Sequence, residues 1–255
     1  MQSTSNSQLP LVLSYLGLRK CIGIIGVALP LFLLFGRILL ESLGMMKWES
    51  LGILDSISVY YYSVMRDVFV GSLCATGVFL ISYRYERWGW DDILGDVAGI
   101  SAIGVALFPT TPPPTPKVVV TTLQMTIGTV HLLLAGCFLL TLALFAAWLF
   151  QKTDPNKEPT DEKRLRNKVY AFCGSAIVVF LVLIVLVIFF PGPLWLQSLH
   201  PLFWLESLAT WAFGIAWFIK GEGVPPLNDK KEDVVTRKNV RSFQPDTLER
   251  REEAL

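Results

Sequence analysis

The chain has 255 residues, of which 53% are hydrophobic and 17% charged, and its mean hydropathy is +0.51. Long apolar runs separated by charged blocks are typical of membrane proteins and exclude an ordinary soluble domain. The formal net charge of +1 gives no reason to expect a nucleic-acid partner.

Residues 1–19 contain a short apolar patch, "LPLVLSYLGL", without basic residues ahead of it. We expect this segment to lie at the membrane interface, followed by an uncleaved first helix. A spanning helix needs roughly 20 mostly apolar residues. Six windows fit a transmembrane domain over residues 20–220: 20–41, 64–85, 93–110, 126–151, 169–190 and 198–220. Residues 221–255 are charged, with few large apolar residues, which predicts a mobile tail.

Lysine and arginine placement predicts the orientation of these helices. Positive charges gather before the first window, after the second, in the block 151–168 and in 220–238. The connections near residues 50, 115 and 193 are poor in positive charge. The positive-inside rule therefore predicts that both termini are cytoplasmic.

Small residues in the third window predict a close helix contact. Gly95 and Gly99 have a G-x-x-x-G spacing, which Ser101 and Gly104 extend. Such a face lets a neighbouring helix approach closely.

Polar residues converge on the predicted extracytoplasmic side of the bundle. Ionisable groups in lipid are costly unless they are paired or hydrated, so each should have a partner. The sequence predicts a polar pocket there, lined by Arg66, Asp67, His131, Glu206, His200, Arg37 and Tyr62. The simpler alternative is that Arg66 with Asp67 and Arg37 with Glu41 snorkel to the interface, while the histidines only pack helices.

On the cytoplasmic side, Asp91, Asp92 and Asp96 begin the third window, where carboxylates suit the positive end of a helix. Lys220 ends the last window and is interpreted as a snorkelling terminus. The cytoplasmic halves of the helices offer few polar groups, so a small-substrate or proton-coupled transporter is the third choice.

A metal-dependent hydrolase is the second choice. His131 and His200, with Asp67 or Glu206, could hold zinc and activate water. Alkaline ceramidases and the progestin and adiponectin receptors are superficially similar, but their pattern includes an H-x-x-x-H pair. The present chain has two histidines and lacks that pair.

Residues 95–150 carry a partial family resemblance. "GVALFPTTP", followed by "VHLLLAGCFLLTLALF", resembles the DRAM-type membrane proteins and a related bacterial group, with matches at Phe108, Pro109, His131 and Ala135. The resemblance implies a six-helix bundle with a lipid-linked or trafficking role and no established reaction. Thr110 and Thr111 stand where the pattern has an acidic residue.

The sequence therefore predicts an all-α polytopic membrane bundle that binds a lipid or another amphiphile in an extracytoplasmic-side pocket. No cofactor is indicated. A partner membrane protein or a second copy of the chain is compatible with this composition, and an accessory-subunit role also stays open.

Overall fold

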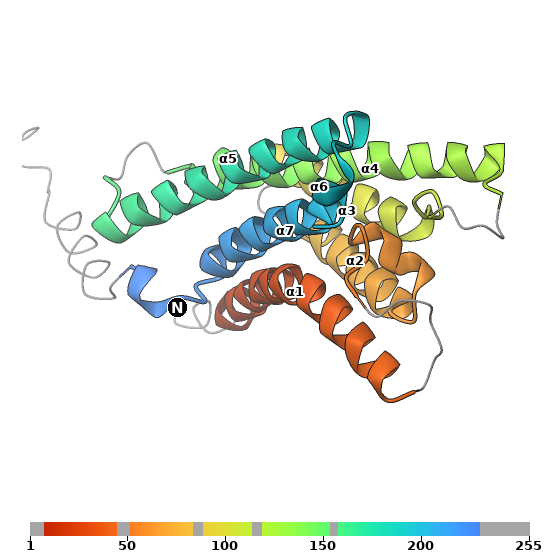
Figure 1. Cartoon of the computed structure of the whole chain (residues 1–255). Helices are drawn as coiled ribbons and strands as arrows, with labels where there is room; N and C mark the ends of the chain where they lie inside the picture. The colour runs from red at the N-terminus through yellow and green to blue at the C-terminus, as the bar shows by residue number, and fades with distance from the viewer. Residues whose placement is uncertain (1–7, 45–51, 84–88, 114–118, 154–157, 230–255) are drawn as a thin grey trace, which may run out of the picture.

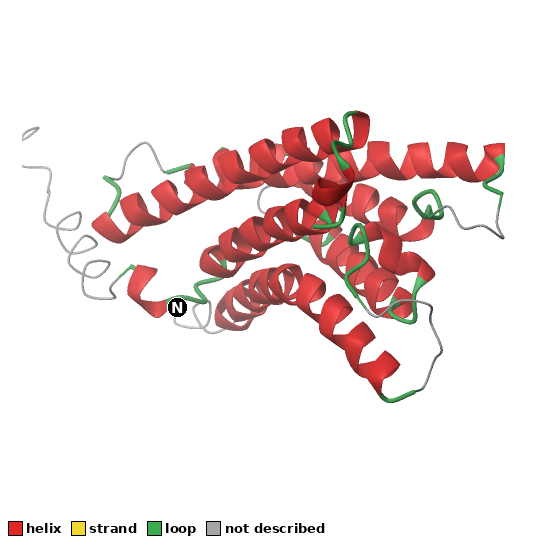
Figure 2. Cartoon of the chain, in the orientation of Figure 1, coloured by secondary structure: helices red, strands yellow, loops and turns green. Residues whose placement is uncertain are grey.

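The computed structural model describes residues 8–44, 52–83, 89–113, 119–153 and 158–229, with side chains from Tyr15 onward. Helices and loops account for all of these residues, and no strand occurs among them (Figure 2). The predictions for residues 1–7 and 230–255 lie outside the described part of the chain.

Six long helices form the fold (Figure 1), and each coincides with one predicted window: α1 (Gln8–Ser42), α2 (Arg66–Ile81), α3 (Trp90–Leu107), α4 (Thr122–Ala147), α5 (Asp161–Phe189) and α7 (Pro201–Lys220). Short helical turns lie between or after them: η1 (Ser58–Tyr62), η2 (Leu149–Gln151), α6 (Leu194–Gln197) and η3 (Pro225–Leu227). α1 begins at Gln8, so residues 8–19 of the expected interfacial segment continue the first helix. No proline or glycine interrupts residues 11–16, and nothing there stops the helix.

Four of the helical segments are long and apolar enough to cross a membrane: Tyr15–Ser42, Thr122–Gln151, Asp161–Phe189 and Pro201–Lys220. α2 is shorter, with 16 residues, and α3 carries three aspartates in its 18 residues. The described structure thus supports a helical membrane protein, as the composition predicts.

The six long helices form a closed ring. α1 packs against α2 and α7, and the ring continues from α7 through α5, α4 and α3 back to α2. Contacts between helix ends show that successive helices run in opposite directions. Lys152, after α4, pairs with Asp91 at the start of α3, and Lys163, at the start of α5, bonds to the carbonyl oxygen of Phe150 after α4. Neighbours in sequence are therefore neighbours in space, as short connections require.

Glycines make two of the helix crossings close. A Cβ added at Gly99 of α3 would lie 2.5 Å from the carbonyl oxygen of Gly77 in α2, and one at Gly95 would lie 2.8 Å from that of Leu80. The part of the predicted small-residue face formed by Gly95 and Gly99 is occupied by α2, whereas Gly104 faces α4, since a Cβ there would lie 2.7 Å from Leu134. α1 and α7 cross in the same way, since a Cβ at Gly214 would lie 2.7 Å from the carbonyl oxygen of Gly23.

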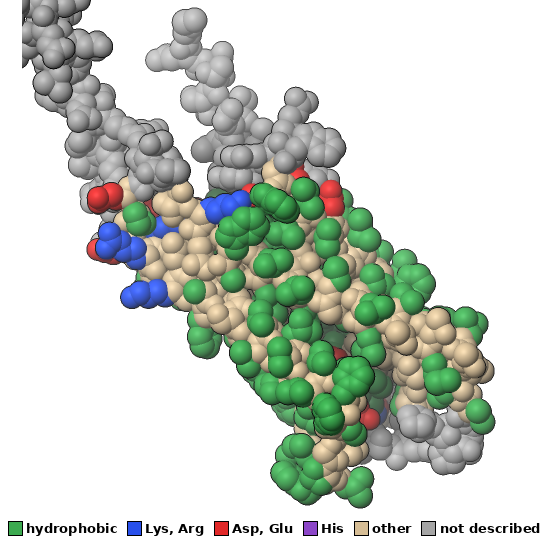
Figure 3. Space-filling view, turned by 90° about the horizontal axis from the view of Figure 1, so that it is seen from above, with side chains coloured by type: hydrophobic (Ala, Val, Ile, Leu, Met, Phe, Trp, Pro, Cys, Tyr) green, Lys and Arg blue, Asp and Glu red, His purple; other side chains and the backbone are tan. Residues whose placement is uncertain are grey.

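The outer surface of the bundle is apolar. Large side chains such as Phe32, Leu133 and Phe172 are exposed, as expected for residues that face lipid. In Figure 3 apolar side chains cover most of the face shown, and Lys and Arg gather at one end. α1 contains Pro30 and changes direction near its middle (Figure 1). Proline removes a helical hydrogen bond and its ring crowds the preceding turn, which accounts for this bend.

Candidate functional site

The loop between α1 and α2 gathers most of the polar residues at one end of the ring. We call residues 52–65 the cap segment and the end where it lies the cap end. Hydrogen bonds join the cap segment to α1, to α4, to α7 and to Thr110, which follows α3. The opposite end, where the Lys and Arg side chains gather, is called the basic end.

The start of α7 anchors the middle of the cap segment. The Glu206 carboxylate accepts a 2.6 Å hydrogen bond from the backbone N–H of Ile57. Asp55, two residues before Ile57, makes two further hydrogen bonds. Its backbone oxygen accepts from the N–H of Phe203 at 3.0 Å, and its carboxylate lies 2.9 Å from His200 Nδ1. The sequence predicts a cationic or hydrogen-bonding partner for Glu206, with Arg66, Arg37 and the histidines as candidates. A backbone amide takes that place, and no side-chain pattern indicates such a partner.

His131 links the cap segment to the end of α3. Its Nδ1 lies 2.7 Å from the Phe108 carbonyl oxygen, and its Nε2 lies 2.9 Å from the Ser58 hydroxyl. A carbonyl oxygen only accepts, so Nδ1 carries a proton, and Nε2 of the neutral ring accepts from Ser58. The Tyr62 hydroxyl donates to the Thr110 carbonyl nearby, at 2.6 Å. These bonds hold the cap segment against α4 and the residues after α3.

A buried ion pair forms the third polar group of the cap end. Arg37 Nε lies 2.6 Å from Glu41 Oε1, and the two side chains are only 4% and 6% exposed. Arg37 also donates to the Gly52 carbonyl oxygen at 2.9 Å. Tyr60 is fully buried within electrostatic range of both charges. We call Arg37, Glu41 and Tyr60 the Arg37 group.

Two buried polar atoms of the Arg37 group keep an unused hydrogen-bonding position. Glu41 Oε2 has no partner, and the Tyr60 hydroxyl proton has no acceptor, while the Leu54 backbone amide acts on the Tyr60 oxygen. Burial raises the pKa of Tyr60 above its ordinary value, so the phenol keeps its proton and remains a donor. A buried polar atom without a partner costs on the order of 1–3 kcal/mol. A buried donor and a buried acceptor within one group therefore mark a place where a small polar group would be stabilised.

Arg66 and Asp67 do not join these residues. Their side chains lie 3.6 Å apart and are 59% and 96% exposed. The Arg66 guanidinium lies 6.0 Å from the centre of the Tyr61 ring. α2 begins at Arg66 itself, so the pair occupies the first turn of the helix, where a carboxylate suits the helix dipole. This position needs no buried partner.

The two histidines have separate partners. His131 bonds to Ser58 and the Phe108 carbonyl, whereas His200 bonds to Asp55. Within the described ranges, no group of three or more His, Cys, Asp or Glu side chains could hold a metal ion. The hydrolase alternative thus gains no support from the described residues.

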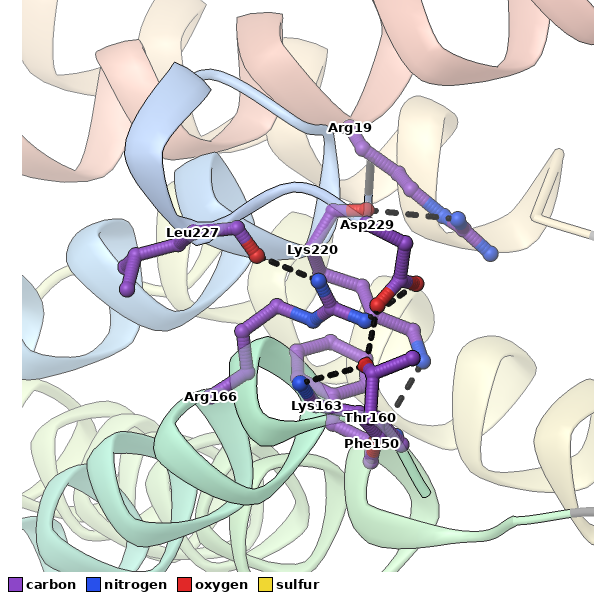
Figure 4. Close-up of polar contacts among 8 residues, drawn as sticks. All are labelled: Arg19, Phe150, Thr160, Lys163, Arg166, Lys220, Leu227 and Asp229. Atoms are coloured by element: carbon purple, nitrogen blue, oxygen red, sulfur yellow. Dashed lines mark hydrogen bonds and ion pairs between the residues drawn. The ribbon is translucent and has the colours of Figure 1, made fainter. Parts of the chain in front are cut away.

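A second set of polar residues, which the sequence did not predict, lies at the basic end. Arg19 of α1, Lys163 and Arg166 of α5 and Lys220 of α7 converge there (Figure 4). We call these four residues the basic cluster. Lys163 Nζ and Lys220 Nζ both donate to the Phe150 carbonyl oxygen, at 2.9 and 3.3 Å. Arg19 donates to the Lys220 carbonyl oxygen at 3.3 Å and to the Tyr83 hydroxyl at 2.9 Å.

The chain after α7 packs onto this cluster. Arg166 donates to the Leu227 carbonyl oxygen and, at 2.8 Å, to the Asp229 carboxylate. The Thr160 hydroxyl, which caps α5, also donates to Asp229. The predicted mobile tail begins at residue 221, but the described residues 225–229 lie against α5, because Arg166 and Thr160 bind Leu227 and Asp229 there. Burial would raise the pKa of Asp229, but the bonds from Thr160 and Arg166 lower it below its ordinary value.

Aromatic rings surround the Arg19 side chain. The guanidinium carbon lies 4.3 Å from the centre of the Tyr15 ring and 5.2 Å from that of Tyr83. The two rings stack on each other with their centres 5.1 Å apart. Cation–π contacts of this kind stabilise a charge that is shielded from water.

Comparisons with known proteins leave the function open. No protein-family profile matches the chain, and no characterised protein or solved structure is significantly similar to it.

Proposed function

We propose that this protein is a six-span integral membrane protein, with both termini cytoplasmic, that binds a lipid-like amphiphile at its extracytoplasmic end. The alternating helix directions and the distribution of charge support this topology. Among the described residues, the cap end has two basic residues, Arg37 and Arg66. The basic end has eight: Arg19, Lys20, Lys152, Lys163, Arg164, Arg166, Lys168 and Lys220. By the positive-inside rule the basic end faces the cytoplasm.

The observation that carries the binding proposal is the Arg37 group. Its buried carboxylate oxygen Glu41 Oε2 has no partner and the proton of its buried phenol has no acceptor, while Arg37 provides a positive charge in the same group. A polar head group with one donor and one acceptor would satisfy both atoms. The exposed side chain of Ile38, which lies between Arg37 and Glu41 on α1, would contact the hydrocarbon part of the same molecule.

The remaining cap-end residues would then position the site rather than form it. His131, Glu206 and His200 hold the cap segment, and the cap segment carries Tyr60. Membership of the DRAM-type group stays a prediction. The bond between His131 and the Phe108 carbonyl joins the two parts of that motif in the folded chain.

Native mass spectrometry of the gently solubilised full chain tests this proposal. We expect a lipid-sized adduct on the natural sequence, and we expect Tyr60→Phe to reduce it strongly, because this change removes one hydroxyl and leaves the ring. Asp67→Asn is the matched control, since Asp67 lies at the same end but is exposed. Equal adducts on all three proteins would overturn the assignment of the site to the Arg37 group.

A further inference from the structure

The basic cluster brings like charges together around a neutral acceptor. The side-chain amino groups of Lys163 and Lys220 share the carbonyl oxygen of Phe150, so the two groups are close neighbours. Arg19 and Arg166 lie within electrostatic range of Lys220. Charges at such separations repel each other, and more strongly where water is excluded. An arrangement of this kind is favourable when an anion lies between the cations.

Few carboxylates face these four cations. Asp229 is the one carboxylate that the described structure hydrogen-bonds to the cluster, through Arg166. Asp91 acts on Lys220 at longer range and lies 3.8 Å from Lys152. Glu158, just ahead of α5, has an interaction of its own. Besides Asp229, the hydrogen-bond acceptors identified for the cluster within the described ranges are the neutral oxygens of Phe150, Lys220, Leu227 and Tyr83.

Asp229 occupies the position that an external anion would take. One carboxylate oxygen accepts from the Thr160 hydroxyl, and the other accepts from Arg166 (Figure 4). Thr160 is the N-cap of α5, so the carboxylate also lies at the positive end of that helix. A hydroxyl, a guanidinium and a helix N-terminus are the donors that proteins use for phosphate groups.

We propose that the basic cluster binds the phosphate group of a phosphate-bearing ligand, and that Asp229 of the chain's own C-terminal segment occupies the site until the ligand displaces it. A phosphate monoester carries about −1.5 to −2 charges at neutral pH and offers three acceptor oxygens. It can therefore bond to Lys163, Lys220 and Arg166 together, whereas the Asp229 carboxylate bonds to Arg166 and Thr160. The phosphate belongs either to an anionic lipid of the cytoplasmic leaflet or to a soluble compound, and both share this chemistry.

Ligand-dependent thermal stability of the purified full chain tests the proposal, because a ligand that binds the folded state raises the melting temperature. The probes are dioctanoyl phosphatidic acid, dioctanoyl phosphatidylcholine and inorganic phosphate. In the Tyr60→Phe variant, in which the proposed extracytoplasmic site is weakened, we expect phosphatidic acid to raise Tm and phosphatidylcholine to leave it unchanged. An equal rise with inorganic phosphate would identify a soluble source, and a rise with phosphatidic acid alone would identify a lipid. Equal shifts with phosphatidic acid and phosphatidylcholine would overturn the proposal.

Three variants test the residues. We expect Lys163→Gln to weaken the binding of phosphatidic acid by about tenfold, the effect of losing one charge-assisted hydrogen bond. Arg164→Gln is the control, because Arg164 is exposed on the same helix and its loss changes net charge equally. Asp229→Asn should strengthen binding, since the competing carboxylate loses its charge, and misfolding cannot produce this gain. Equal effects of Lys163→Gln and Arg164→Gln, or no gain with Asp229→Asn, would contradict the proposal.

This site is independent of the proposed extracytoplasmic site. The basic cluster and the Arg37 group lie at opposite ends of the helices, so loss of binding at one leaves the other to be tested separately.

Discussion

Single residues at the cap end act mainly by holding backbone groups. His131 satisfies a carbonyl with Nδ1 and a hydroxyl with Nε2, and Glu206 accepts from a backbone amide. The Arg37 group differs, because Glu41 Oε2 has no partner and the Tyr60 hydroxyl proton has no acceptor. We therefore assign His131 and Glu206 to holding the fold and the Arg37 group to binding a ligand.

Asp229 at the basic end gives a pH-dependent prediction. The pKa of this carboxyl is lowered in the folded state, so its contribution is complete above the ordinary pKa of aspartate, about 3.9, and is lost as the pH falls through the lowered value. We expect the amides of Leu227 and Asn228, which bond to the Val224 and Pro225 carbonyl oxygens, to exchange slowly with deuterium at pH 7 and to lose this protection at the acid end of the range. Asp229→Asn should lack the protection already at pH 7. Protection that persists in this variant would show that Asp229 does not hold the segment.

The helices were predictable as elements, because their apolar runs are long and charged blocks separate them. Two boundaries moved. α1 starts at Gln8, because the apolar patch ahead of Arg19 continues the same helix, and α5 starts at Asp161, because its charged first turns are also helical. The cap segment could not be predicted, since residues 52–65 show neither helical periodicity nor a turn motif. Its structure follows from tertiary bonds to Glu206 and His131.

Packing of α2 on α3 gives a prediction for the element scale. We expect Gly77→Ala to destabilise the protein by about 1–3 kcal/mol, the usual cost of overpacking. The added Cβ would lie 2.7 Å from the Gly99 carbonyl oxygen. Gly71→Ala, in the same helix, is the control, because nothing lies within 4 Å of its Cβ, and alanine favours a helix over glycine by roughly 0.5–1 kcal/mol. Thermal unfolding in detergent measures both, and a similar Tm for the two variants would contradict the close crossing.

The whole molecule is an antiparallel ring with one basic end and one end closed by the cap segment. Of the residues proposed from the sequence for one pocket, the ring brings His131, Glu206, His200, Arg37 and Tyr62 to the cap segment. It leaves Arg66 and Asp67 exposed beside them. The alternation of helix directions also explains why the basic cluster combines residues from the start of α1 and α5 with one from the end of α7.

Membrane orientation is the prediction at this scale. In a variant without the four natural cysteines, we expect Ser198→Cys, beside α6 at the cap end, to react with a membrane-impermeant maleimide on intact cells. Thr153→Cys, at the basic end, should react only after the membrane is opened. Both positions are exposed, so burial does not limit the reaction. The reverse pattern would place the basic end outside the cell and the termini with it.

The sequence by itself determined that the protein is helical, where the six long helices lie and on which side its positive charges gather. Apolar length and charge are local properties that can be read along the chain. The tertiary structure decided the ring order, the cap segment, the Arg37 group and the basic cluster. Each of these depends on contacts between residues far apart in sequence, often with a backbone amide or carbonyl as one partner, and every residue has such groups whatever its side chain. For this reason Lys220 reads as a snorkelling helix end in the sequence, whereas in the folded chain it shares the Phe150 carbonyl with Lys163.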